Sequence, residues 1–470
     1  MNILITGATG YIGRRLKHRL LSEDVNIRLF MKRDKPSIEK QNIQVSIGTT
    51  FDPISLEKAL VGIDVAYYLI HSMDSKNYQE LDRKSAENFR EACIKQGVKR
   101  IIYLGGLGDK ETASEHLLSR IETGEILSKQ PDKIQTLWFR AGVIIGSGSA
   151  SFEIIRHLVE KLPFMITPKW VNTLCQPSAQ KDVIEYLAQA AFIDTPHSTI
   201  IDIGSKTMSY KDLLLGYALA CGLKRTLIPV PFFSPKLSSY WLTLMTPVPY
   251  SVASALIEGL KSEVLLKNDN ATKLFPNIHP MDYEDAVKET IEEIKHKQII
   301  SRWSDASGEA WEIDHSALSN AVFIDRQALP MGNHSAHKVY TTFCAVGGKN
   351  GWFGYDLLWR TRGAIDKLFG GYGLSRGRRD SRELRIGDSV DFWKVVDLQE
   401  NKRLLLFAQM KLPGIAWLEF LIKDGTFYQT AYFYPHGLAG RIYWYLLIPL
   451  HFFVFNGMAH NLMKSIKDED

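Results

Sequence analysis

The sequence predicts an α/β protein in which a doubly wound parallel sheet with a substrate lobe precedes a smaller C-terminal α+β domain. Three observations support this prediction. Strand-like and helical patterns alternate through the first third of the chain, a glycine-rich turn follows the first strand directly, and aromatic-rich strand-like runs precede one long apolar helix. A chain of 470 residues exceeds one hydrophobic core, so several domains are expected.

The first third contains apolar runs of strand length that are separated by helical patterns. This alternation is typical of a parallel sheet with helices on both faces. The expected strands are NILIT at 2–6, NIRLF at 26–30, IQVSI at 43–47, AYYLI at 66–70, RIIYL at 100–104 and TLWFRAG at 136–142.

Residues 151–300 keep helical patterns but are less regular, with proline-rich loops at 229–235 and 246–249. We assign them to a lobe on the substrate side of the sheet, so that residues 1–300 form one domain. The polar, turn-rich sequence at 301–330 predicts a linker. Residues 331–470 then form the second domain.

The second domain combines strand-like runs between residues 389 and 435 with a final apolar helix, which predicts an antiparallel sheet wrapped around that helix. The helix offers fourteen residues from Ile442 to Phe455, interrupted by Pro449 and His451. A membrane-spanning helix needs about 20 apolar residues. Burial against the sheet is therefore favoured, with peripheral membrane contact as the alternative.

Charge and cysteine patterns exclude several classes of protein. The net charge of +5 is small for this length, and the densest basic run, at 376–385, also contains acidic residues, so no nucleic-acid partner is expected. The four cysteines form no CxxC or Cys/His cluster, which argues against disulfides and a metal site. Because MNILITG begins a strand directly, no targeting peptide is expected, and a cytoplasmic location is predicted.

The segment ITGATGYIGRRL at 5–16 follows a strand and opens a helix, which is the setting of a dinucleotide-binding turn. In such a turn the first glycine permits the tight bend, the second lets backbone amides approach a pyrophosphate, and the third lets the helix pack close to the sheet. The helix N-terminus adds its positive end. The residues predicted to bind the cofactor here are Gly7, Ala8, Thr9, Gly10, Tyr11, Ile12 and Gly13.

The end of the second strand favours one nicotinamide cofactor over the other. Lys32 and Arg33 lie where an NAD site carries an acidic residue for the ribose 2′-OH. Cationic side chains fit a 2′-phosphate, so NADP(H) is favoured over NAD(H). His71 and Ser72 follow the fourth strand at the carboxyl edge of the sheet, and we predict that they line the cofactor pocket.

These motifs resemble those of an atypical, extended-like short-chain dehydrogenase/reductase. The stretches 116–127 and 139–171 and the C-terminal YWYLLIPLHFFVF further resemble bacterial NAD(P)-binding proteins that carry a C-terminal domain of unknown function, DUF2867. The resemblance implies a Rossmann domain and a tail domain similar to helix-grip (START-like) folds. Relatives often carry Gly-Asp after the third strand, where the acid meets the adenine. This chain has Gly48-Thr49 there, so Thr49 becomes the candidate contact.

The resemblance also implies a catalytic Tyr-x-x-x-Lys pair and a serine, which this chain lacks. The fifth strand ends with Gly105-Gly106, and the next helix bears His116 and Arg120 at the spacing of the pair. Three interpretations remain open. His116 acts as a general acid while Arg120 binds ribose or a substrate anion, or both residues only bind ligand, or both lie on a solvated helix face with glutamate partners. The first interpretation supplies the predicted catalytic residues.

Large apolar residues are dense in the substrate lobe, and the implied tail domain would enclose an apolar cavity. We therefore predict an NADP(H)-dependent oxidoreductase, a reductase of a hydrophobic carbonyl compound. The alternatives are a non-catalytic NADP(H)-binding sensor, assembly or structural protein, and a sugar-nucleotide epimerase-like enzyme. The oligomeric state does not follow from the sequence.

Overall fold

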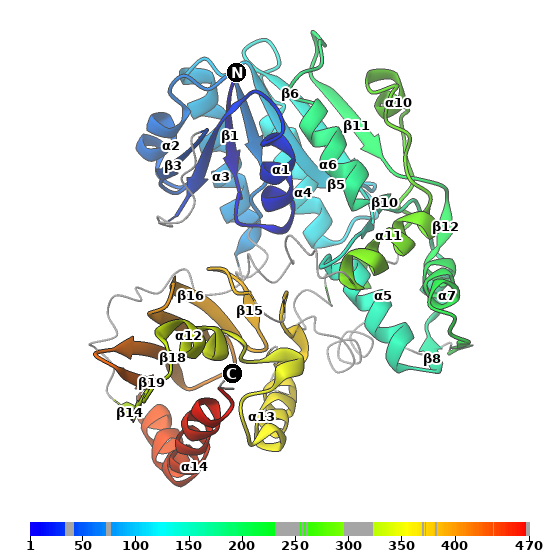
Figure 1. Cartoon of the computed structure of the whole chain (residues 1–470). Helices are drawn as coiled ribbons and strands as arrows, with labels where there is room; N and C mark the ends of the chain where they lie inside the picture. The colour runs from blue at the N-terminus through cyan, green and yellow to red at the C-terminus, as the bar shows by residue number, and fades with distance from the viewer. Residues whose placement is uncertain are drawn as a thin grey trace. The chain divides into compact units, whose positions relative to one another are not determined.

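The computed structural model describes residues 1–32, 42–71, 77–230, 254, 257–259, 262–295, 323–368, 371, 373–380, 383–435 and 437–466. The described residues fall into two compact units (Figure 1). Residues up to 295 belong to the first unit, and residues from 323 onward belong to the second.

A seven-stranded parallel sheet forms the centre of the first unit. Its strands are β1 (Asn2–Thr6), β2 (Asn26–Met31), β3 (Ile43–Ile47), β4 (Val65–Tyr68), β5 (Arg100–Gly106), β6 (Gln135–Ala141) and β11 (Thr199–Ile203). They lie in the order β11-β6-β5-β4-β1-β2-β3. The predicted doubly wound parallel sheet is confirmed, and each predicted strand matches an observed one within two residues.

Helices cover both faces of this sheet, as Figure 1 shows. One face shares a hydrophobic core with α1 (Tyr11–Leu20), α6 (Gln180–Gln189) and α10 (Asn270–Leu274). The other face packs against α2 (Pro53–Leu60), α3 (Tyr78–Lys95) and α4 (Glu115–Leu127). Because β1 lies between β2 and β4, the strand order reverses there, and the crevice at the carboxyl ends of β1 and β4 is the expected ligand position.

The substrate lobe has its own hydrophobic core. Buried side chains of α5 (Ala150–Lys161), α7 (Tyr210–Ala220) and α11 (Tyr283–Lys295) meet there, and the rings of Phe152 and Tyr217 pack edge to face. Three two-stranded sheets complete the lobe: β7 (Ile144–Ile145) with β10 (Ser178–Ala179), β8 (Phe164–Thr167) with β13 (Thr226–Pro229), and β9 (Leu174–Cys175) with β12 (Met208–Ser209).

The second unit contains a six-stranded antiparallel sheet, as predicted for this domain. Its order is β14 (Phe323–Pro330), β19 (Thr426–Pro435), β18 (Gly414–Lys423), β17 (Arg403–Ala408), β16 (Trp393–Gln399) and β15 (Ser389–Val390). The helices are α12 (Ala336–Cys344), α13 (Asp356–Leu368) and α14 (Gly437–Lys464). Residues 323–330, which we placed in the linker, instead form β14 and pair with β19 along their whole length. The strand is an edge strand with alternating burial, so its sequence is as polar as a loop.

Burial of the final helix is uneven along its length. In its C-terminal half, Met458, Ala459 and Leu462 are fully buried in the core of the unit. Between residues 438 and 453, large apolar side chains such as Leu446 and Phe453 are exposed. The predicted burial against the sheet therefore holds for the last turns of the helix, and before them only for single side chains such as Trp444. Among the described residues, Leu438–Lys464 is one helix that is long and apolar enough to cross a membrane, and only 22% of its most apolar window is buried.

Candidate functional site

The glycine-rich turn has the close packing that a dinucleotide-binding turn requires. Gly7 has a φ of +65°, and a Cβ on it would lie 2.4 Å from the carbonyl oxygen of Leu69. A Cβ on Gly13 would lie 2.3 Å from the carbonyl oxygen of Gly7. Only glycine permits these two contacts, which bring α1 against the turn and the turn against the segment that follows β4.

The first turn of α1 is built to receive an anion. Its N-cap is Gly10, which has an extended backbone, and no side chain caps the helix. The N–H groups of the first turn and the positive end of the helix therefore fit a pyrophosphate. The residues present fit the cofactor that the motif implies.

The remaining residues of the turn could contact a cofactor through their backbone. Ala8 is buried in the core beside the sheet, and Ile12 packs against the same core. The Thr9 carbonyl accepts a hydrogen bond from Arg14 Nε at 2.9 Å. The Tyr11 hydroxyl is buried, and its burial raises the pKa of that phenol. The hydroxyl of Tyr11 is therefore not exposed to a ligand, and a contact of this residue with the cofactor through its amide remains a prediction.

The other predicted cofactor residues are only partly described. Lys32 is exposed directly after β2, at the position expected for a 2′-phosphate contact. Arg33 and Ser72 lie outside the described residues. The Thr49 hydroxyl accepts from the Phe51 amide at 3.4 Å, so this side chain is already engaged in the turn that leads into α2. An adenine contact by Thr49 remains a prediction.

A chain of polar contacts joins α3, α4 and the end of β4. Asp82 Oδ2 lies 2.8 Å from His71 Nδ1, and His71 Nε2 lies 3.3 Å from His116 Nε2. Ser119 donates a second hydrogen bond to Asp82, at 3.1 Å. Because Asp82 accepts the proton on Nδ1 of His71, the Nε2 atom of neutral His71 carries a lone pair that faces His116. The structure thus brings the predicted residues His71 and His116 together.

Both imidazoles are held in their neutral form. Burial lowers the pKa of His116 from 6.5 to about 2, and the neighbouring His71 and Arg120 lower it further in the same direction. Burial also lowers the pKa of His71, against the opposing hydrogen bond from Asp82. At neutral pH the pair therefore has a vacant proton position, and His116 is in the form that accepts a proton.

Arg120 lies over the carboxyl end of β5. A Cβ on Gly106 would lie 3.6 Å from Arg120 Cδ, an ordinary contact distance, and 2.5 Å from Leu117 Cδ1, so Leu117 fills the space that a serine side chain would need. The Arg120 carbonyl accepts a hydrogen bond from the Tyr103 hydroxyl, which places Tyr103 in the core under α4. His116 and Arg120 are both half-buried on the side of α4 that faces the carboxyl edge of the sheet.

Two of the glutamates that a solvated-face interpretation requires are engaged elsewhere. Glu122 pairs with Arg83 on α3 at 2.8 Å, and Glu125 pairs with Lys110 at 2.8 Å. The contacts of His116 are with His71 and with the ring of Tyr78, whose centroid is 6.2 Å away. The geometry thus favours a site over a solvated face for this residue.

Asp82, Ser119 and Tyr78 were not among the residues predicted from the sequence. A signal for Asp82 was present, because it belongs to a buried stripe on α3 with three- and four-residue spacing that continues through Ser85, Ala86 and Phe89. A carboxylate on the buried stripe of a helix needs a partner, and a histidine after the neighbouring strand is one. The contact itself depends on how α3 packs and was not readable from the sequence.

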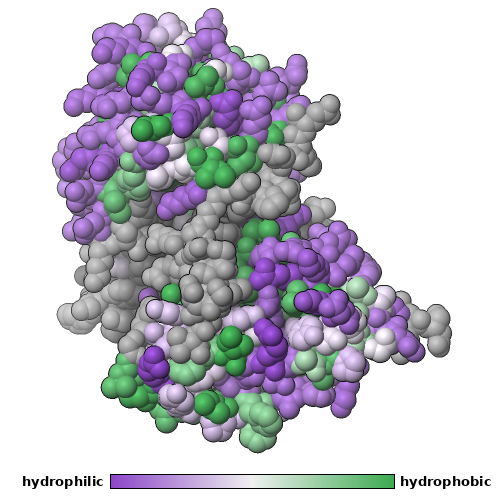
Figure 2. All heavy atoms as spheres, turned by 90° about the vertical axis from the view of Figure 1, so that its left-hand side faces the viewer, coloured by the Kyte–Doolittle hydropathy of each residue, from purple (hydrophilic) through white to green (hydrophobic). Residues whose placement is uncertain are grey.

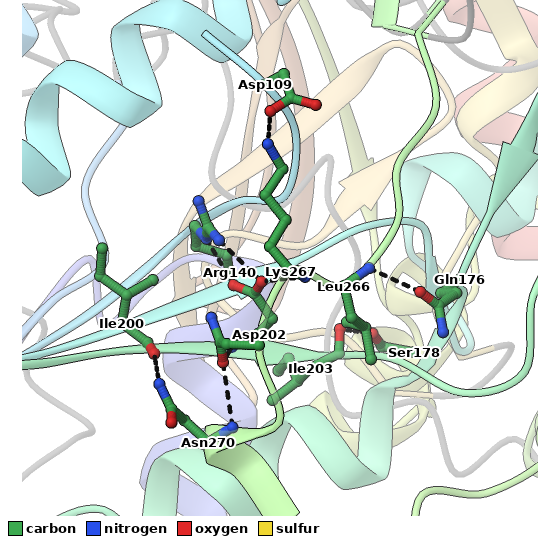
Figure 3. Close-up of polar contacts among 11 residues, drawn as sticks. Asp109, Arg140, Gln176, Ser178, Ile200, Asp202, Ile203, Leu266, Lys267 and Asn270 are labelled. Carbon is green, nitrogen blue, oxygen red and sulfur yellow. Dashed lines mark hydrogen bonds and ion pairs between the residues drawn. The ribbon is translucent and has the colours of Figure 1, made fainter.

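A second polar cluster fastens the loop before α10 to the last strand of the sheet (Figure 3). Arg140 forms a bidentate ion pair with the buried Asp202, with N–O distances of 2.6 and 2.8 Å. The Lys267 amide donates to the same carboxylate at 2.8 Å, and the Lys267 ammonium pairs with Asp109. Because Asp202 satisfies the charge of Arg140, this edge arginine positions the loop and is not assigned to catalysis.

The second unit contains a cavity of about 130 Å³. Aromatic and aliphatic side chains of α13, α14 and the sheet line it. Trp359, Trp393 and His451 also line it. In the described part of the chain, the indole nitrogens of the two tryptophans and Nδ1 of His451 are buried without a hydrogen-bond partner. An apolar cavity with unpaired donors fits an apolar molecule that carries an acceptor oxygen.

Comparison with known proteins agrees with this division. Residues 7–131 match the NAD(P)H-binding family, and residues 317–458 match the family described as protein of unknown function, DUF2867. Ceramide reductase of Caulobacter vibrioides is 22% identical over 237 residues, which cover 49% of this chain and 73% of that enzyme.

Solved structures resemble the first unit in fold. Triphenylmethane reductase of Citrobacter sp. superimposes with a TM-score of 0.52 at 19% identity, covering 62% of this chain and 100% of the reductase. An NADPH-dependent quinone oxidoreductase of Escherichia coli, complexed with NADPH, gives a TM-score of 0.50 at 17% identity and covers 62% of this chain and 99% of its own. The matches bear out the predicted NAD(P)H-binding domain followed by a DUF2867 domain, and the solved structures bear out the fold of the first unit.

Proposed function

Because the chain joins an NAD(P)H-binding domain to a DUF2867 domain, we propose that it is an NADP(H)-dependent reductase of an apolar carbonyl compound. The observation that carries the proposal is the contact chain Asp82–His71–His116 at the carboxyl edge of the sheet, beside the dinucleotide turn. A bound nicotinamide supplies the hydride. The residues of the chain supply the proton and hold the substrate oxygen.

The two halves of the reaction use the two protonation states of the histidine pair. During reduction the carbonyl carbon gains the hydride and its π electrons move to oxygen. The histidine pair, which is neutral at rest, takes up a proton from solvent, and His116 passes that proton to the oxygen. In the reverse direction neutral His116 accepts the hydroxyl proton. Asp82 orients His71 and stabilises positive charge on the histidine pair. Arg120 binds either the cofactor ribose or an anionic group of the substrate.

Several features favour an apolar substrate. On the lobe, Phe164, Ile166 and Ile228 are exposed on the two-stranded sheet formed by β8 and β13. In the second unit, the cavity with unpaired indole donors fits an apolar molecule that carries an oxygen acceptor. Large exposed apolar groups on a lobe beside a nucleotide domain mark a binding surface.

The alternatives predict different behaviour. A non-catalytic sensor or assembly protein needs the dinucleotide turn but gains nothing from a buried carboxylate that orients two histidines, which costs desolvation free energy. An epimerase-like enzyme returns its hydride to the sugar and leaves no oxidised cofactor. The histidine pair therefore favours the reductase.

The proposal is tested by mixing the purified protein with NADPH and either 2-tetradecanone or menadione. We expect loss of NADPH absorbance that depends on the added carbonyl compound. NADPH that binds tightly but is never oxidised with any member of a wider apolar carbonyl panel would favour the sensor.

The preference for NADP(H) is tested by replacing Lys32 and Arg33 with alanine. A charged hydrogen bond to phosphate contributes about 1.5–3 kcal/mol, so the double variant should bind NADPH at least about tenfold more weakly while NADH affinity stays unchanged. Calorimetric titration with both nucleotides measures this difference. Lys129→Ala, a change at an exposed lysine after α4, is the matched control. Equal affinity of the unaltered protein for both nucleotides would show that the cofactor assignment is wrong.

A further inference from the structure

We propose that the outer surface formed by α13 and by residues 438–453 of α14 docks onto an anionic lipid bilayer. We call this surface the apolar face and define it by six exposed side chains: Leu357 and Leu368 on α13, and Leu438, Ile442, Leu446 and Phe453 on α14. Leu446 is 73% exposed and Leu368 is 77% exposed. The proposal concerns a surface that the reductase activity does not require.

The arrangement of α14 is unusual for a helix on the surface of a domain. Its exposed apolar residues recur at three- and four-residue intervals from Leu438 to Phe453, so they form one stripe. A surface helix normally turns charged and polar side chains outward, but over this stretch the only charged residue is Arg441. Figure 2 shows hydrophobic side chains in green at the lower end of the molecule, where Figure 1 draws α14. A surface of this kind marks an interaction site.

The two helices present their apolar side chains together. Trp359 of α13 packs edge to face on Phe455 of α14 at 6.2 Å, and both helices line the same cavity. The two helices are therefore neighbours in the second unit.

The charges beside the apolar face favour a negatively charged partner. Residues 437–464 contain no aspartate or glutamate, while Arg441 and Arg360 are exposed. On α13, Asp366 is buried and its carboxylate accepts the amides of Gly373 and Lys411, so it does not offset these cations at the surface.

A second copy of the chain is a poorer occupant than a bilayer. A twofold dimer would place the apolar face of one subunit against that of the other, so exposed arginines would face exposed arginines. Among the described residues of the two helices, Asp356 is the one exposed acidic residue that could pair with them. Anionic lipid headgroups supply the missing negative charge, and their acyl chains receive the leucine, isoleucine and phenylalanine side chains.

The helix is inferred to lie in the bilayer surface and not to cross it. Met458, Ala459 and Leu462 anchor its C-terminal half in the core of the unit, and Trp444 anchors its N-terminal half. A crossing would pull these side chains out of the protein, whereas insertion of the exposed stripe leaves them in place.

Vesicle co-sedimentation of the full-length protein tests the proposal. We expect binding to vesicles of phosphatidylcholine mixed with phosphatidylglycerol, weaker binding to phosphatidylcholine alone, and loss of the difference at high salt. The double variant Leu446→Glu, Phe453→Glu should bind at least about tenfold more weakly, because it places two charges in the apolar stripe. The pair Leu219→Glu, Ile54→Glu, at positions equally exposed in the first unit, is the matched control and should bind normally.

A second pair of measurements separates the outcomes. Arg360→Gln with Arg441→Gln should remove the preference for anionic vesicles and leave weak binding to phosphatidylcholine. Light scattering without lipid should give the same mass for the unaltered protein and for the Leu446→Glu, Phe453→Glu variant. No binding to either vesicle, or a dimer that this variant converts to a monomer, would overturn the proposal and assign the apolar face to a protein partner. Each measurement is independent of whether the first unit reduces a carbonyl compound.

Discussion

Replacement of His116 with alanine is expected to lower the rate of carbonyl reduction by about 10²–10⁴, the usual contribution of a general acid. The affinity for NADPH should change little, because the dinucleotide turn lies on α1 and does not include His116. Single-turnover kinetics and calorimetric titration measure the two quantities separately.

The role of the contact chain is tested by Asp82→Asn. The amide no longer stabilises positive charge on His71, so the rate should fall less than in His116→Ala and should recover partly at lower pH, where the pair gains a proton more readily. Since burial lowers the pKa of His116 from 6.5 to about 2, the reduction rate of the unaltered protein should keep rising as the pH falls below neutrality, without levelling off near 6.5. Glu122→Gln, which removes an ion pair with Arg83 that does not include either histidine, is the control. A rate of His116→Ala equal to that of the unaltered enzyme would remove His116 from the mechanism.

Replacement of Gly7 with alanine is expected to abolish useful nucleotide binding. The added Cβ would lie 2.4 Å from the Leu69 carbonyl oxygen, so the turn must move away from the segment that carries His71. We expect NADPH affinity to fall by more than about 100-fold, or about 2.7 kcal/mol.

Gly62→Ala provides a matched control for the backbone. Gly62 also has a positive φ, of +71°, but a Cβ there would meet nothing within 4 Å. Both variants lose stability from the left-handed conformation, by roughly 1–2 kcal/mol, and only Gly7→Ala adds the clash. Unfolding in urea measures the shared loss, and titration with NADPH measures the specific one. Equal NADPH affinity in the two variants would contradict the packing argument.

The parts of the fold that were predictable are those that depend on local sequence. The strands of the first unit follow from apolar runs between helical patterns, and the dinucleotide turn follows from three glycines directly after a strand. The position of His116 and Arg120 on the same face of α4 follows from their four-residue spacing.

The remaining features depend on tertiary contacts. Strand β14 has the composition of a loop and becomes a strand because β19 offers it a full register of hydrogen bonds. Asp82 acquires its role when α3 packs beside α4, and the exposure of α14 depends on how much of the helix the sheet can cover. Apolar sequence alone does not distinguish a buried helix from one that faces a lipid or a partner.

The proposed function requires that the first unit transfer hydride to an apolar carbonyl while His116 supplies the proton. Mass spectrometry of the product formed from 2-tetradecanone and NADPH labelled with deuterium at C4 of the nicotinamide tests both requirements. We expect an alcohol with one deuterium on the carbinol carbon, formed about 10²–10⁴ times more slowly by His116→Ala. Formation of labelled alcohol at the same rate by the variant, or no transfer of deuterium to any apolar carbonyl by a protein that binds NADPH, would contradict it.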